Sequence, residues 1–167
     1  DCCCRSNLNQ QKSMTSDLFS SSLRAYRERG FFKEIKILRG IERESLRVDK
    51  NGKISQKNHP KNLGSPLTNS DITTDFAEAL VELVTPTFES PEELFDHLNL
   101  LHRFLYSELV DEMLWNFSMP CAFTNEKEIR IAEYGNSNNG MLKHVYRKGL
   151  RLRYGSIMQC VSGIHYN

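Results

Sequence analysis

Carboxylates lie inside two of the most apolar segments of this 167-residue chain. The segment 36–48 is rich in Ile, Leu and Val, alternates imperfectly, and contains Glu42 and Glu44. In a strand, side chains at i and i+2 share one face, about 7 Å apart. We therefore expect a strand with two like charges on one face, which repel by roughly 2 to 3 kcal/mol at an effective dielectric of 20.

Two interpretations of this glutamate pair are open. A cation beside the pair turns repulsion into attraction, and Mg²⁺ suits such a site because it binds carboxylate oxygens and keeps positions for water and phosphate. Alternatively, the pair lies on a solvated strand face with Arg39, Arg43 and Arg47 as neighbouring partners. From this motif alone the solvated face is favoured, since charged edge strands are common.

A second acidic cluster lies in the apolar segment 72–86 and consists of Asp75, Glu78 and Glu82. The composition is compatible with a helix, in which all three would share a face. The short apolar run that ends at Pro86 favours a buried strand over about 78–85, in which Glu78 and Glu82 share a face. Acids among apolar residues are costly to bury unless they are paired or bind a metal.

Three helices are expected. Ser16 caps a helix over about 17–29 that stops at Gly30. A capping box with Pro at the first position starts another at 91 that runs to about 112, with its inward face formed by Leu94, Leu98, Leu101 and Leu105. The third is a basic helix over about 141–154. The other expected elements are a turn at 49–52, loops at 55–70 and 115–121, a short strand in 128–134, a turn at 135–140 and a closing strand in 157–167.

The composition excludes several classes of protein. With 39% apolar residues, 26% charged residues and a net charge of +1, the chain fits one globular domain rather than a disordered one. The balance gives no reason to expect nucleic acid or a membrane as partner. No apolar run is long enough to span a membrane and no secretory signal is visible, so the default expectation is a cytoplasmic protein.

The polar residues 1–13 show no periodicity and precede Met14, so we interpret them as a tail and assign the domain to 14–167. Three of the five cysteines are consecutive at 2–4, without a second Cys/His pair at zinc-finger spacing. Cys121 and Cys160 are isolated among apolar residues, which is typical of buried thiols. No disulfide framework is indicated.

Two further features are ambiguous. His165, in the closing segment, is most simply a hydrogen-bonded strand residue. The basic helix presents either a solvated face or an anion site for phosphate or carboxylate, through Lys143, Arg147, Lys148, Arg151 and Arg153. The chain has no P-loop and no GxGxxG motif, so a nucleotide would be held through metal and basic side chains.

Several blocks together resemble the proteobacterial type of glutamate–cysteine ligase, in family order and over about residues 35–167. These blocks are RGIERESLRV (39–48), ITTDFAEALVELVTP (72–86), FSMPC (117–121), AEYGNSNNG (132–140), YRKGLRLRYG (146–155) and MQCVSGIHYN (158–167). The family's catalytic chain is about three times longer, so the chain resembles its N-terminal part. We expect no turnover from these residues by themselves.

The resemblance implies an α+β fold, namely a glutamine-synthetase-like antiparallel sheet backed by helices, here incomplete. It also implies ATP-dependent ligation of L-glutamate, through its γ-carboxylate, to L-cysteine by way of γ-glutamyl phosphate, the first step of glutathione biosynthesis. The cofactor implied is Mg²⁺, with Mn²⁺ as a substitute, and the partners are these small molecules with ATP as co-substrate.

By the same resemblance, individual residues acquire roles, none of them catalytic beyond metal binding. The residues that look like metal ligands are Glu42, Glu44, Asp75, Glu82 and His165. Those that look like substrate-binding residues are Phe76, Tyr146, Arg147, Gln159 and Asn167. Glu78 matches its block without an implied role and is interpreted as a structural partner.

Two rival functions remain open at this point. One is another ATP-dependent carboxylate–amine ligase of the same fold with a different amine acceptor. The other is a non-catalytic binding module that contacts RNA or another acidic partner through the basic helix 141–154, against which the near-neutral net charge argues.

Overall fold

The computed structural model describes residues 17–33 and 35–167, which fall into two compact units that divide between Ile37 and Leu38. In the first unit, residues 17–28 are helical, as expected, and a 3-10 turn, η1 (Phe31–Lys33), follows Gly30. Gly30 has φ +71°, a left-handed conformation that lets glycine end a helix. The predicted Ser16 cap and the 1–13 tail lie outside the described residues.

The second unit is built on a five-stranded antiparallel sheet with strand order β2-β3-β1-β4, in which β5 also pairs with β1. The strands are β1 (Ile41–Val48), β2 (Ile72–Thr74), β3 (Leu80–Val84), β4 (Met113–Trp115) and β5 (Ile164–Tyr166). The central strand β1 contacts β3 along one edge. Its other edge pairs with β5 near the start of β1 and with β4 near its end.

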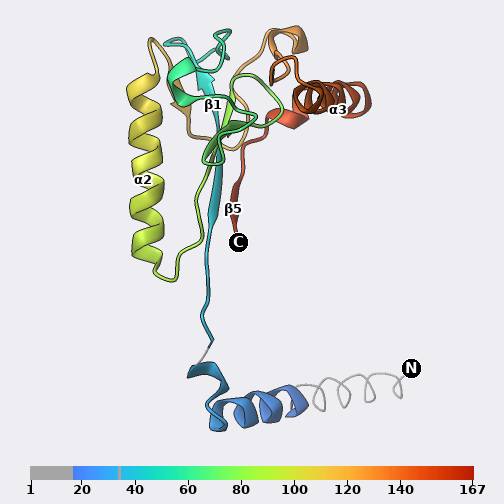
Figure 1. The fold of residues 1–167 in the computed structure, drawn as a ribbon. Helices are drawn as coiled ribbons and strands as arrows, with labels where there is room; N and C mark the ends of the chain where they lie inside the picture. Colours follow the sequence, from blue (N-terminus) through green and yellow to red (C-terminus); the bar gives the residue numbers. More distant parts are fainter. Residues whose placement is uncertain (1–16, 34) are drawn as a thin grey trace, which may run out of the picture. The chain divides into compact units, whose positions relative to one another are not determined.

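Helix α2 (Pro91–Glu108) backs one face of this sheet, and α3 (Asn138–Tyr154) lies on the opposite side of β1 in Figure 1. The leucines of α2 that were predicted to point inward are all buried. They pack on side chains at alternate positions of β3, such as those of Val81 and Leu83. A second core on the other face joins Leu46, Val48 and Leu80 to Ile129 and Ile131. The α+β architecture with an antiparallel sheet backed by helices is therefore confirmed.

Alternation along β1 separates two sets of side chains. Ile41, Arg43 and Arg47 point toward the α2 side, where Arg43 Nε donates to His102 Nε2 of α2 at 3.1 Å. Glu42 and Glu44 point to the opposite face. The solvated-face interpretation is wrong in its pairing of Arg43 and Arg47 with these glutamates, because the two sets lie on different faces.

Several predicted boundaries are wrong for local reasons. The first strand begins at Ile41 rather than 36. The expected helix to 112 ends at Glu108, because Asp111 takes φ 54° and Glu112 bonds Arg47 across the sheet at 2.7 Å. Trp115, the first residue of the loop predicted at 115–121, is instead the last residue of strand β4.

The later part of the chain is less regular than predicted. Segment 128–134 forms no strand; it makes one bridge, between Ile131 and Ala77, and begins in a 3-10 turn, η3 (Glu126–Glu128). The turn predicted at 135–140 is cut short because Ser137 caps α3 by accepting the Gly140 N–H at 3.2 Å. The closing segment contains a 3-10 turn, η4 (Met158–Cys160), before the three exposed residues of β5.

The turn after β1, the 55–70 loop with its short 3-10 turn η2 (Lys61–Leu63), and the basic helix are confirmed. Cys121 and Cys160 are free and buried, as expected. Over the described residues, no helix is both long and apolar enough to cross a membrane.

Candidate functional site

Four ionisable side chains from three strands share the sheet face opposite α2. Glu44 stands directly across from Glu82, and Glu42 directly across from His165. Directly opposed residues of an antiparallel pair point to the same side, and Glu42 and Glu44 are two apart in β1. The structure therefore brings together Glu42, Glu44, Glu82 and His165, which are up to 123 positions apart in sequence.

Hydrogen bonds hold the Glu42 end of this group. Glu42 Oε2 lies 3.1 Å from His165 Nδ1, and Asn167 Nδ2 donates to Glu42 Oε1 at 3.2 Å. The bond to Glu42 raises the pKa of His165 above its usual value of 6.5, since it favours the charged imidazolium. The strand pair β1–β5 thus places one base of intermediate strength beside the acids.

The Glu44–Glu82 end is short of positive charge. Burial raises the pKa of Glu44, although its Oε2 accepts the Gly163 N–H at 2.7 Å. Burial, followed by the charges of Asp75 and Glu44, raises the pKa of Glu82 to about 7. No hydrogen-bond donor among residues 17–33 and 35–167 reaches the Glu82 carboxylate. This part of the face would gain from an added cation.

Asp75 and Arg147 form the rim of the face. Arg147 comes from α3, donates through Nε to the Asp75 carbonyl, and holds Nη2 at 3.6 Å from Asp75 Oδ1. Its guanidinium lies 4.7 Å from the centroid of the Tyr134 ring, in a cation–π contact that helps to hold the arginine in place. The rim carries one fixed positive charge next to the acids.

The donor set fits a hard divalent cation, because carboxylate oxygens and one imidazole are ligands that Mg²⁺ and Mn²⁺ accept. The side chains do not form a finished centre: within the described part of the chain, no three His, Cys, Asp or Glu side chains converge as a metal-binding group. Metal binding by Glu42, Glu44, Asp75, Glu82 and His165 therefore stays a prediction.

The residues predicted to bind substrate are dispersed. Asn167 and Arg147 lie at the face and its rim. Tyr146 projects from α3 with 63% of its surface exposed, whereas Phe76 is 1% exposed and belongs to the core under the face. Gln159 is in η4, where its N–H donates to Ser156 O at 3.2 Å. Their roles also stay predictions.

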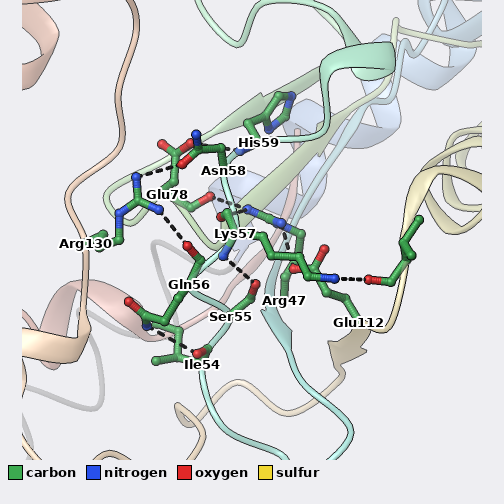
Figure 2. A network of polar contacts seen from close by, with 11 residues as sticks. Arg47, Ile54, Ser55, Gln56, Lys57, Asn58, His59, Glu78, Glu112 and Arg130 are labelled. Carbon is green, nitrogen blue, oxygen red and sulfur yellow. Dashed lines mark hydrogen bonds and ion pairs between the residues drawn. The ribbon is translucent and has the colours of Figure 1, made fainter.

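Glu78 does not share the face of Glu82, contrary to the strand prediction, because it lies in the turn before β3. In the network of Figure 2 its buried carboxylate accepts the His59 N–H, while its backbone carbonyl accepts from Arg47 Nη2 and its backbone N–H donates to Arg130 O. The interpretation of Glu78 as a structural partner fits this place.

Two contributors escaped the sequence reasoning. Gly163 donates to Glu44, and a Cβ there would lie 2.8 Å from His165 Nε2, so any larger residue would displace the His165 ring. Its position two residues before a candidate histidine was the available signal. Tyr134, under Arg147, offered no signal because its segment was assigned to a strand.

Three of the five basic residues considered for an anion site on α3 make contacts within the molecule. Arg151 donates to Ser156 Oγ and to the Ile129 carbonyl. Lys143 lies 4.9 Å from the Tyr134 ring centroid, and Arg147 contacts Asp75. These contacts argue against an anion-binding face for RNA.

Comparison with known proteins identifies relatives over most of the chain. The family model described as glutamate-cysteine ligase matches residues 22–167. The glutamate–cysteine ligase of Pseudomonas putida (strain W619) is 58% identical over 130 residues, which are 78% of this chain and 25% of that protein. That of Pseudomonas syringae pv. syringae is 55% identical over 130 residues, or 78% and 24%.

Two solved structures of related enzymes also match most of the chain. The glutamate–cysteine ligase of Francisella tularensis, in complex with AMP, is 48% identical with a TM-score of 0.76 and covers 77% of this chain and 26% of its own. A bifunctional glutathione synthetase from Pasteurella multocida is 36% identical with a TM-score of 0.69, covering 77% and 16%. The chain thus spans about a quarter of the length of the curated relatives it matches.

Proposed function

Because the chain belongs to the glutamate–cysteine ligase family, we propose that it is part of the machinery that joins L-glutamate to L-cysteine with ATP. In this reaction the γ-carboxylate of glutamate attacks the γ-phosphate of ATP and releases ADP. The amino group of cysteine then attacks the γ-glutamyl phosphate, and inorganic phosphate leaves. The product is γ-glutamylcysteine.

The observation that carries the proposal is the acidic face, where Glu44 and Glu82 oppose each other and no lysine or arginine in the described part of the chain pairs with either. The residues that would hold Mg²⁺, or Mn²⁺ in its place, are Glu42, Glu44, Asp75, Glu82 and His165. When bound, such a cation would offset the negative charge on the phosphate oxygens during phosphoryl transfer.

The chain's own residues have separate tasks in this proposal. Glu42 orients the His165 ring through the Nδ1 contact at 3.1 Å, so that Nε2 is the ring nitrogen available as a ligand. Arg147 offers a guanidinium at the rim, suited to a carboxylate or phosphate oxygen. Tyr146, exposed one residue earlier in α3, is available to a substrate.

Cation binding is the part of the function that the 167 residues are expected to perform. Mn²⁺ affinity, measured by electron paramagnetic resonance of the free ion near pH 7.5, should fall about tenfold or more in Glu82→Gln. The matched control is Glu93→Gln, which removes the same charge from α2 on the other side of the sheet. Equal affinities for the wild type and Glu82→Gln would overturn the proposal.

Turnover is a separate expectation. The matched residues make up about a quarter of the relatives' length, and we expect cation binding without turnover from this chain. Phosphate release that requires ATP, glutamate and cysteine together would contradict that expectation. Replacing cysteine with other amines in the same assay would then distinguish this ligase from one with another acceptor.

A further inference from the structure

Glu78 carries the most heavily bonded carboxylate in the network of Figure 2 and is 4% exposed. Its Oε1 accepts the His59 N–H at 2.8 Å and its Oε2 accepts the Glu133 N–H at 2.9 Å. Its own N–H donates to Arg130 O at 2.9 Å, and its carbonyl accepts from Arg47 Nη2 at 2.9 Å. Four bonds therefore fix the turn between β2 and β3 to three neighbouring segments.

One of these bonds leads directly to the rim of the acidic face. Glu133 is followed by Tyr134, whose hydroxyl donates to Thr74 O at 2.6 Å and lies 2.9 Å from Asp75 O. The Tyr134 ring also supports the Arg147 guanidinium. Arg147 in turn donates to the Asp75 carbonyl. A displacement of the Glu133 amide would thus reach both rim residues.

We propose that Glu78 is a positioning residue that sets Asp75 and Arg147 at the rim of the acidic face through the Glu133 amide and Tyr134. This inference rests on the proposed function, since the rim matters only if the face binds a cation and substrate. Two backbone donors that converge on one side chain require a double acceptor, which accounts for a carboxylate at this position. A role in stability alone would not extend to Arg147, so the test reads the state of Arg147 directly.

The test uses Glu78→Gln, which presents an amide N–H to one of the two backbone donors and so loses one bond. The matched control is Glu112→Gln. Glu112 has a side chain that is also 4% exposed and bonds Arg47 in the same network, but its bond is to the guanidinium and not to the 130–134 segment. Both variants weaken the network, but only Glu78→Gln disturbs the bonds that connect it to the 130–134 segment and, through Tyr134, to the rim.

The first readout is independent of metal: the ¹⁵N resonance of Arg147 Nε–H and its exchange with water. Loss of one hydrogen bond corresponds to about tenfold faster exchange. We expect that change and a shifted resonance in Glu78→Gln, with Glu112→Gln within twofold of the wild type. If both variants change it equally, or neither does, the positioning role is refuted.

The second readout is Mn²⁺ affinity, which should fall about tenfold in Glu78→Gln, as is typical when a supporting partner of a metal ligand is lost. It should stay within twofold of the wild type in Glu112→Gln. If the wild type binds no Mn²⁺, the proposed function fails, and the Arg147 resonance still decides the inference by itself.

A second variant keeps the test decisive if Glu78→Gln does not fold. Tyr134→Phe leaves the Glu78 bonds in place and removes only the hydroxyl that reaches Thr74 O and Asp75 O. The Arg147 Nε–H should then exchange faster than in the wild type, in the same direction as in Glu78→Gln. An unchanged resonance in Tyr134→Phe would refute the path.

Discussion

Replacing Glu82 with Gln should make the cation-free protein more stable at pH 8 while it removes a proposed metal ligand. The pKa of Glu82 is raised from 4.5 to about 7, first by burial and then by the charges of Asp75 and Glu44. The folded state therefore binds this proton more tightly than the unfolded state does. Gln keeps the shape of the side chain and cannot ionise.

The sign and size follow from proton linkage. Below pH 4.5 the carboxyl is protonated in both states, so it contributes no pH dependence. As pH rises from 4.5 to about 7, the unfolded chain loses the proton first, and stability falls by about 1.4 kcal/mol per pH unit. The total is about 3 kcal/mol, or about 2 kcal/mol after allowance for water around this half-buried side chain.

Urea unfolding at pH 4 and pH 8, for wild type and Glu82→Gln, measures the effect. The variant should match the wild type within about 0.5 kcal/mol at pH 4 and exceed it by about 2 to 3 kcal/mol at pH 8. Saturating Mn²⁺ should close that gap by stabilising the wild type alone. A variant that is equally stable or less stable than the wild type at pH 8 would refute the reasoning.

Three further outcomes are expected. Arg47 is 0% exposed and pairs with Glu112 at 2.7 Å, so Arg47→Met should cost about 3 to 5 kcal/mol in urea unfolding. The double variant Arg47→Met/Glu112→Leu should recover most of that loss; additive losses would contradict the pairing. Glu42→Gln should lower the pKa of His165 toward 6.5, as followed by its ring proton resonances, and an unchanged pKa would exclude the hydrogen bond as its cause. Leu105 is 0% exposed, so Leu105→Ala should lower the free energy of unfolding by about 2 to 5 kcal/mol. Leu100→Ala, at an exposed position of the same helix, should lower it by under about 1 kcal/mol.

Sequence reasoning worked best where one local rule decides the structure. The i, i+2 spacing of Glu42 and Glu44 placed both on one strand face, and Ser90 with Pro91 marked the start of α2. The leucines of α2 followed from helical periodicity alone. The carboxylate face of β1 could therefore be predicted without knowledge of any partner strand.

Register across the sheet could not be predicted in the same way. The opposition of Glu44 to Glu82 depends on how β1 and β3 align, and a slip of one residue would turn Glu82 toward α2. The family resemblance, rather than spacing, suggested that these acids and His165 belong together. The strand predicted in 128–134 was wrong for a related reason, since the Glu133 amide donates to the Glu78 side chain instead of to a neighbouring strand.

The two kinds of buried acid in this molecule argue for the position of the site. Glu78 and Glu112 are buried with full sets of partners: two backbone amides for the first and the Arg47 guanidinium for the second. Glu82 faces Glu44, no lysine or arginine of the described residues pairs with it, and burial, followed by the charges of Asp75 and Glu44, raises its pKa. Residues 17–33 and 35–167 supply Arg47 to one face of β1 and no lysine or arginine between Glu44 and Glu82, which leaves a destabilising arrangement in the cation-free state. A divalent cation bound there would make that arrangement favourable, which is the property such a binding site requires.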